Sequence, residues 1–213
     1  LDTRLDGRDI QVQGVGEGAS QASKDSLNDP ARTMISETQY AWLTNGLTTS
    51  TSTWRVIGNQ VMFTPVDVTP IDTAYLFNAV GPLFAAFLRP QVPTLQGVFE
   101  LAFYGDVWSN YPAQRSALTQ LLERTPVTNT VIVTGDFHCA FAFDVPGPTK
   151  NVAVEFMTPS ISASNFDENL GSVAFLQPIL PALLGTVDTT LRKLNPHLKW
   201  HDITEHGYEL VDI

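Results

Sequence analysis

The stretch Asn129-Thr130-Val131-Ile132-Val133-Thr134-Gly135-Asp136-Phe137-His138 decides the fold class of this 213-residue chain. Its β-branched, apolar first half predicts a buried strand over 129–134, and Gly135 ends that strand just before an acidic residue and a histidine. Ligands of open α/β sheets gather beyond the carboxyl ends of the strands. An Asp and a His two residues apart on an extended segment leave the chain on the same side. The stretch therefore predicts an α/β fold with a ligand site at the end of this strand.

The side chains of Asp136 and His138 suit a metal ion. Carboxylate oxygens and imidazole nitrogens are ligands for zinc, iron, manganese or calcium. A turn aspartate followed by a surface histidine is the alternative, because a bare Gly-Asp-x-His pattern is common by chance. The pattern by itself leaves both interpretations open.

Helices and strands alternate on either side of this stretch. Ser36 suits the N-cap of one helix, and Pro112 suits the first turn of another that ends near Arg124. A third, apolar helix is predicted within 175–194 and is broken near its prolines. Further strands are predicted at 54–58, 139–143, 152–156 and 208–211.

Two longer segments lack a regular pattern. Residues 11–30 are rich in Gly, Ser, Gln, Asn and Asp and are predicted to form a surface loop. Residues 64–100 are interrupted by prolines and are predicted to be irregular, with a short apolar helix at 75–88 inside an insertion. That helix could cover an active-site mouth, although packing onto the body of the domain is the simpler interpretation.

Residues 1–4 read as the end of a strand already in progress. No linker or repeat divides the chain, so one domain is expected.

Composition and charge exclude several classes of protein. With 12 basic and 22 acidic residues the net charge is −10, which argues against a nucleic-acid-binding surface. The single cysteine, Cys139, excludes an intramolecular disulfide and a cysteine-based zinc cage. No apolar run approaches the ~18 residues of a spanning helix, so no membrane span is expected. The hydrophobic content of 43% is sufficient for a buried core.

The remaining histidines gather near the C-terminus. Asn195-Pro196-His197 is followed by His201 and His206, and neutral imidazole is a common metal ligand. Asp202 and Glu205 are candidates to orient such a ring. For each histidine a capped or solvated side chain is the alternative, and for His201 that alternative is favoured.

A phosphate-like substrate would require planar or amide donors, and the candidates in this chain are Arg4, Asn59, Gln60, Trp108 and Arg115. Each candidate also has a structural interpretation, because an arginine after a strand usually pairs with a nearby carboxylate, here Asp2 or Asp6, and a tryptophan is commonly a core or rim residue. The chain has no Gly-x-Ser-x-Gly elbow, P-loop or dinucleotide-binding glycine motif, which weighs against serine hydrolases and nucleotide-driven enzymes.

An ordered series of short motifs covers almost the whole chain. The series runs Leu1-Asp2-Thr3-Arg4, Arg32-Thr33-Met34-Ile35, Gln39-x-x-Trp42-Leu43, Trp54-Arg55-Val56-Ile57-Gly58-Asn59-Gln60-Val61-Met62, Tyr111-Pro112-Ala113-Gln114-Arg115, Thr134-Gly135-Asp136-Phe137-His138, Glu155-Phe156-Met157-Thr158-Pro159-Ser160-Ile161, Asn195-Pro196-His197-Leu198 and His206-Gly207-Tyr208. In this order the motifs resemble the PhoD-type alkaline phosphatase/phosphodiesterase family of the calcineurin-like metallophosphoesterases.

The resemblance implies a fold, an activity and a set of site residues. The fold is a four-layer αββα sandwich, and the activity is hydrolysis of phosphate mono- and diesters by a metal-activated water. The implied metals are iron and calcium, with zinc or manganese as alternatives. Asp136 and His138 match the family's Gly-Asp-x-His motif as catalytic and metal-binding residues, and His197 matches its Asn-Pro-His motif as a further metal ligand. Arg4 matches a catalytic, phosphate-binding arginine, while Asn59, Gln60 and Trp108 are implied to contact substrate.

The chain also departs from the family pattern. It has Trp108-Ser109-Asn110-Tyr111 where members often carry Trp-Asp-Gly-Tyr, and the family's first metal motifs have no counterpart here. Residues 1–213 are therefore expected to be the C-terminal part of a single PhoD-like domain, periplasmic or secreted as the family is. The enzyme would need an upstream segment, in the same chain or as a second fragment. A non-catalytic half-domain that requires a partner chain is the alternative, and a zinc hydrolase of carboxylic substrates is disfavoured because no His-Glu-x-x-His motif occurs.

Overall fold

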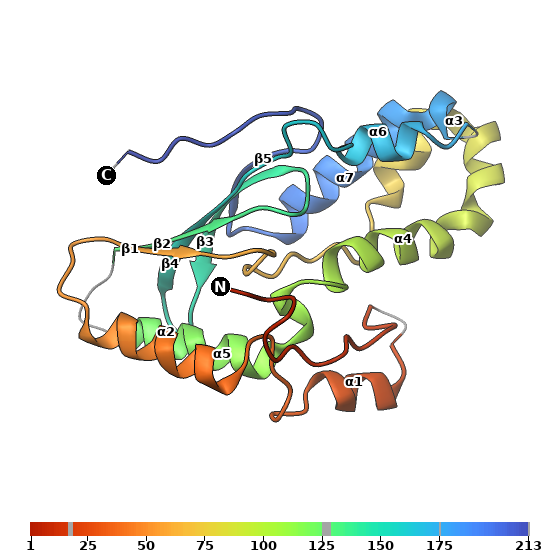
Figure 1. Cartoon of the computed structure of the whole chain (residues 1–213). Coiled ribbons are helices and arrows are strands. Elements are labelled where there is room, and N and C mark those ends of the chain that lie inside the picture. Colours follow the sequence, from red (N-terminus) through yellow and green to blue (C-terminus); the bar gives the residue numbers. More distant parts are fainter. Residues whose placement is uncertain (17–18, 125–128, 175, 213) are drawn as a thin grey trace.

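A five-stranded mixed sheet forms the centre of the computed structural model, which describes residues 1–16, 19–124, 129–174 and 176–212 (Figure 1). The strand order is β1-β2-β4-β3-β5. The strands are β1 (Arg55–Gly58), β2 (Thr130–Thr134), β3 (Ala140–Pro146), β4 (Asn151–Met157) and β5 (Leu198–Asp202). The α-helices are α1 (Gln21–Leu27), α2 (Glu37–Thr49), α3 (Thr73–Leu88), α4 (Val92–Tyr104), α5 (Pro112–Arg124), α6 (Phe166–Gly171) and α7 (Leu180–Leu194).

Strand direction places two strand ends at one edge of the sheet. β1, β2 and β4 are parallel, whereas β3 runs antiparallel to both β4 and β5. Thr134 at the end of β2 is in register with Met157 at the end of β4, and β3 starts at the same edge. The loop after β2 therefore lies at the carboxyl end of the parallel strands, as the sequence predicts.

Helices cover one face of the sheet in two groups (Figure 1). Leu43 and Leu47 of α2 and Leu118 of α5 pack over β1 and β2 in one core cluster. A second cluster joins the aromatic side chains of β3 to α4 and α7. Because side chains alternate along a strand, the same alternation directs the intervening residues to the opposite face.

The opposite face of the sheet is apolar and partly open. The residues in register across it are Gly58, Val133, Phe156, Ala142 and Trp200, and Trp200 keeps 54% of its surface exposed. The tail residues 207–209 line a shallow hollow next to Phe156 and Trp200. Apart from this tail, none of the elements in the described ranges covers that row.

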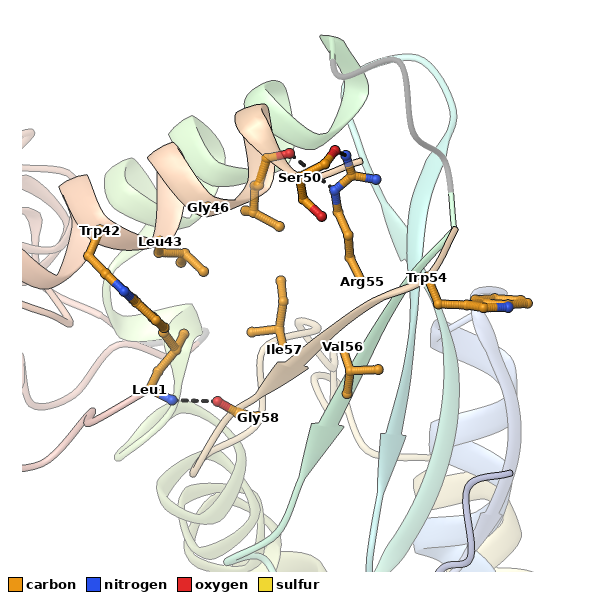
Figure 2. Close-up of a pocket in the computed structure, with 11 residues that line it drawn as sticks. Leu1, Trp42, Leu43, Gly46, Ser50, Trp54, Arg55, Val56, Ile57 and Gly58 are labelled. Atoms are coloured by element: carbon orange, nitrogen blue, oxygen red, sulfur yellow. Dashed lines mark hydrogen bonds between the residues drawn. The ribbon is translucent and has the colours of Figure 1, made fainter. Parts of the chain in front are cut away.

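Strand β1 also has an open edge, because in the described part of the chain it pairs with β2 alone. Figure 2 shows Arg55 and Ile57 pointing toward α2, whereas Trp54 and Val56 point away from it. A groove of about 440 Å³ lies between α2 and this strand. The exposed fraction is 48% for both Val56 and Trp54.

The helix-start predictions are confirmed. The Ser36 hydroxyl accepts a hydrogen bond from the backbone N–H of Gln39 and caps α2, and Pro112 begins α5. The strands over 54–58, 129–134, 139–143 and 152–156 also form, with bounds shifted by one to three residues. The helix predicted within 175–194 is α7, preceded by a 3-10 turn at Gln177–Ile179, while Phe175 lies outside the described residues.

Three predictions about local structure were wrong, and a fourth was confirmed only in part. Residues 208–211 form no strand, and β5 instead takes the last place in the sheet by pairing with β3. Residues 1–4 are not a strand. The expected loop at 11–30 contains α1, a solvent-exposed helix without buried side chains that is capped by the Ser20 hydroxyl. The helix predicted at 75–88 is confirmed as α3, in which Gly81 with φ 76° and Pro82 accommodate a kink, but the segment predicted to be irregular also contains most of α4.

Candidate active site

The loop after β2 holds the two residues that the sequence singles out, in an unusual backbone conformation. Asp136 has φ 74° and His138 has φ 63°, and these are the non-glycine residues with positive φ in the described chain. The expectation of an extended segment is therefore wrong. Left-handed backbone costs roughly 1–2 kcal/mol per residue, and such residues cluster at functional sites. Two of them in three residues mark this loop as a candidate site.

Arg4 reaches this loop from the start of the chain. Its Nη2 donates to Oδ2 of Asp136 at 2.7 Å, and its Nη1 donates to Asp106. The other carboxylate oxygen of Asp106 accepts a hydrogen bond from Arg8. The side chains of Arg4 and Asp136 are 36% and 45% exposed, so the guanidinium stays accessible to a ligand.

Gln60 holds the backbone that carries Arg4. Its Oε1 accepts from the backbone N–H of Thr3 at 2.7 Å and from the Thr3 hydroxyl at 3.1 Å. The carboxylate of Asp2 accepts from the Arg4 backbone N–H at 3.0 Å. Gln60 thus fixes the segment that presents Arg4, and the structure gives it a positioning role.

His138 is oriented by a neighbouring loop. Its Nδ1 lies 2.9 Å from the carbonyl oxygen of Ser164, which can only accept, so Nδ1 carries the proton. In the neutral ring Nε2 is then the unprotonated nitrogen, the form that binds metals. No described residue forms a hydrogen bond with Nε2, which therefore remains available.

Glu155 is a central residue that the sequence reasoning did not select. It is fully buried beneath the end of β2, where its carboxylate accepts from the Thr134 hydroxyl at 2.6 Å and from the backbone N–H groups of Phe63 and Thr64 at 2.9 and 2.7 Å. Burial lowers the pKa of the nearby Arg115 to about 10, although the charge of Glu155 opposes that shift. The isolated acid in Val152-Ala153-Val154-Glu155-Phe156-Met157 was the available signal.

Arg115 takes a structural position. Its Nε donates to the carbonyl of Phe63 at 2.7 Å, and its guanidinium carbon lies 5.2 Å from the centroid of the Phe63 ring. Together with Glu155 it ties the segment after β1 to the sheet. Both residues therefore hold Phe63 in place, Arg115 through its carbonyl and Glu155 through its backbone N–H.

Two of the predicted substrate contacts, Trp108 and Asn59, are hydrogen-bonded to each other inside the described part of the chain. Trp108 is completely buried, packs edge-on against Phe63, and donates from its indole N–H to Oδ1 of Asn59 at 3.2 Å. The amide nitrogen of Asn59 donates in turn to the carbonyl of Val61 at 2.6 Å. Both polar groups of Asn59 therefore have partners within the chain, and the Trp108 ring is enclosed in the core.

His197 does not join Asp136 and His138. Its backbone carbonyl accepts from Asp144, four residues along β3 from the strand start at Ala140, which places it roughly 13 Å along the sheet from the site edge. Its Nε2 lies 2.8 Å from the carbonyl of Pro65, and its ring stacks near Phe143. The prediction of a shared metal for His197 is corrected by this antiparallel register.

The other titratable candidates also have structural partners. The ring of His201 is buried against α7, where Nε2 lies 3.0 Å from Asp188, and burial lowers its pKa. His206 lies 3.3 Å from Glu168, and this hydrogen bond raises its pKa. Burial raises the pKa of Cys139 to about 12, so its thiol stays protonated at neutral pH.

The described residues do not complete a metal site by themselves. They contain no group of three or more His, Cys, Asp or Glu side chains arranged to hold an ion. Asp136 and His138 supply two ligands of suitable type, whereas a protein-bound transition metal usually has three or four protein ligands. Asp136 and His138 thus supply part of a donor set of the right chemistry.

The mixed sheet and its helices define an α/β protein with a candidate site at a strand end. Comparison with known proteins identifies its family. The family profile described as "PhoD-like phosphatase" matches residues 1–213. The chain therefore belongs to the PhoD-like phosphatase family, which confirms the resemblance seen in the sequence motifs.

Two relatives show how much of a longer protein this chain represents. Alkaline phosphatase D of Bacillus subtilis (strain 168) is 26% identical over 164 residues, which are 75% of this chain and 24% of that protein. The solved structure titled "Structure of PhoD" superposes with a TM-score of 0.63 at 24% identity, over 98% of this chain and 32% of that chain. The chain thus spans about a quarter to a third of the length of these relatives, and the structural match supports the α/β fold.

Among the helices that the structure describes, none is long and apolar enough to cross a membrane.

Proposed function

We propose that the protein hydrolyses phosphate mono- and diesters and that residues 1–213 provide one part of its active site. The observation that carries the proposal is the Arg4 guanidinium, paired with Asp136 beside His138 at the end of β2. Membership of the PhoD-like phosphatase family and similarity to an alkaline phosphatase support the same activity. In the reaction a water attacks phosphorus, the bond to the leaving oxygen breaks, and the products are a phosphate or phosphomonoester and an alcohol.

Each site residue has a role that follows from its chemistry. Arg4 offers a planar pair of N–H donors that matches two phosphate oxygens and stabilises the charge of the transition state. Gln60 keeps Arg4 in place through Thr3. Asp136 and Nε2 of His138 would hold a metal ion, which supplies charge neutralisation and lowers the pKa of a bound water. We propose iron and calcium as the metals, following the family resemblance, with zinc or manganese as alternatives.

The remaining ligands would come from polypeptide outside residues 1–213, upstream in the same chain or on a second fragment. Two surfaces support this proposal: the open apolar row that includes Val133, Phe156 and Trp200, and the unpaired edge of β1. A second sheet packed on the row would give the four-layer sandwich, because stacked sheets bury such faces against each other. Unpaired edges and exposed apolar faces otherwise favour aggregation.

A non-catalytic half-domain that acts only through a partner chain is the second candidate function. The observation in its favour is that the described residues contain no complete group of metal ligands. It differs from the first proposal in one outcome, because the completed assembly would then bind its partner without hydrolysing phosphoesters.

We also propose that the protein acts outside the cytoplasm, in the periplasm or as a secreted enzyme. The family resemblance supports this location, and a single buried cysteine is compatible with an oxidising compartment. Fractionation of the producing cells with an antibody against residues 1–213 tests it, and recovery in the cytoplasm alone would contradict it.

The activity test uses the full-length protein that carries residues 1–213. It is assayed on p-nitrophenyl phosphate and bis(p-nitrophenyl) phosphate before and after treatment with a chelator. We expect hydrolysis that the chelator abolishes and added metal restores. Hydrolysis that survives complete metal removal would contradict metal dependence, and absence of hydrolysis by metal-loaded protein would favour the half-domain.

The assembly test uses residues 1–213 expressed alone and together with the upstream part. We expect insolubility alone and rescue on co-expression. Val56→Lys places a charge at the open edge and should prevent rescue, whereas Asn45→Lys, on the exposed side of α2, should not. A soluble, cooperatively unfolding monomer of residues 1–213 would contradict the assembly proposal.

A further inference from the structure

An apolar cavity of about 520 Å³ lies directly behind the candidate site loop. Its walls come from α4, α6 and α7 and from Phe137, the residue between Asp136 and His138. The side chains that line it are almost all apolar, and the few polar ones are Thr94, Asn165 and Asn169.

Two links join this cavity to the site. The first is the chain itself, because Phe137 packs against Phe103 and Phe141 at centroid distances of 4.8 and 5.9 Å while its neighbours in sequence carry the polar site groups. The second is the hydrogen bond from His138 to the carbonyl of Ser164. Ser164 immediately precedes Asn165, which caps α6 and lines the cavity.

The cavity is large enough for a small ligand, and its apolar lining favours apolar groups. Pockets for small ligands commonly enclose 300–1,000 Å³, with mostly apolar walls and a few polar groups. Asn165 is already engaged, because its side chain accepts from Glu168 and donates to the carbonyl of Thr204. No charged side chain lines the walls, so the cavity favours an alkyl or aryl group over a sugar or a second phosphate.

Resting on the proposed phosphoesterase function, we propose that this cavity binds an apolar alkyl or aryl substituent of the phosphoester substrate. The phosphate would lie at Arg4, on the polar side of the loop, and the substituent would pass Phe137 into the cavity. Val98, on the exposed side of α4, and Leu170 of α6 are then the residues that determine specificity.

The test measures how the reaction depends on alkyl length in the full-length protein. The substrates are p-nitrophenyl alkyl phosphates from methyl to octyl, and kcat/KM is compared along the series. Burial of apolar surface predicts a rise of up to about fourfold per methylene until the cavity is filled. Val98→Trp fills the cavity and should flatten the series. Leu83→Trp is the matched control, because Leu83 is exposed on α3 and does not line the cavity.

The outcomes separate this inference from the proposed function. Strong hydrolysis of the methyl ester with no dependence on chain length would overturn the inference alone. If no ester is hydrolysed, the proposed function fails, and calorimetry still tests the cavity through binding of octylphosphonate against methylphosphonate. Tighter binding of the octyl compound that Val98→Trp abolishes would support the cavity, and equal binding of both compounds would overturn it.

Discussion

Nη2 of Arg4 donates a hydrogen bond to Oδ2 of Asp136 over 2.7 Å, and so joins two residues that lie 132 positions apart in the sequence. The arginine comes from the first residues of the chain and the aspartate from the loop after β2. Phosphate oxygens would compete with the carboxylate of Asp136 for the same N–H groups. Binding of a phosphate to Arg4 would therefore act on the same hydrogen bond that joins the start of the chain to the loop after β2.

Arg4→Lys should lower kcat/KM for bis(p-nitrophenyl) phosphate in the full-length protein by about 10- to 100-fold. Lysine keeps the charge but loses the planar fork that matches two oxygens. Melting temperature should change little, because partly exposed ion pairs contribute about 0–1 kcal/mol to stability. Arg124→Lys, on an exposed site at the end of α5, is the control. A large drop in melting temperature with normal kinetics would make Arg4 a structural residue instead.

Trp108→Phe should reduce the free energy of unfolding by about 1–3 kcal/mol, since it leaves a cavity and removes the N–H donor to Asn59. Trp42→Phe, on the exposed side of α2, should have almost no effect. Chemical denaturation measures both changes. If KM rose for Trp108→Phe while stability stayed constant, the residue would contact substrate after all.

Acid should destabilise the fold partly through His201. Burial depresses its pKa in the folded state, against the opposing charge of Asp188, while Arg192 and Asp202 lie nearby. A histidine with a depressed folded pKa binds more protons when unfolded, so its contribution is present above about pH 6.5 and is lost as the pH falls toward the folded pKa. His201→Gln should therefore reduce the slope of stability against pH between 7 and 5. An unchanged slope would contradict this role.

His197→Ala should reduce the free energy of unfolding by about 1–3 kcal/mol, because the hydrogen bond to Pro65 and the contact with Phe143 are lost. Metal content and hydrolysis by the folded protein should stay within about twofold of the wild type. Elemental analysis and denaturation measure these quantities together. Loss of metal without loss of stability would return His197 to the metal site.

Local sequence signals predicted much of the fold. Ser36 and Pro112 marked helix starts because capping and proline geometry act within one turn. The strand over 198–202 was missed because its burial does not alternate, since Lys199 and Trp200 are both exposed and His201 is buried. Its stability comes from pairing with β3, which is distant in sequence. The choice between 198–202 and 208–211 was thus decided by tertiary pairing.

The site was predictable to the extent that motif residues meet at one strand end. Arg4, Asp136 and Gln60 do so, and Asp106 supplies a carboxylate close to the Ser109 position where the family often has an acid. Trp108 was misassigned because a sequence does not state which side of a loop an aromatic ring faces. The displacement of His197 follows from the antiparallel register of β3 and β5, which no local pattern encodes.

The most direct test of the central claim is the metal content and hydrolysis rate of His138→Ala in the full-length protein, with His197→Ala measured beside it. If Nε2 of His138 holds the catalytic metal, His138→Ala should lose most of the bound metal and at least about 100-fold in kcat/KM on bis(p-nitrophenyl) phosphate while keeping a folded circular dichroism spectrum. His197→Ala should retain both. A His138→Ala protein with wild-type metal content and wild-type rate would contradict the account.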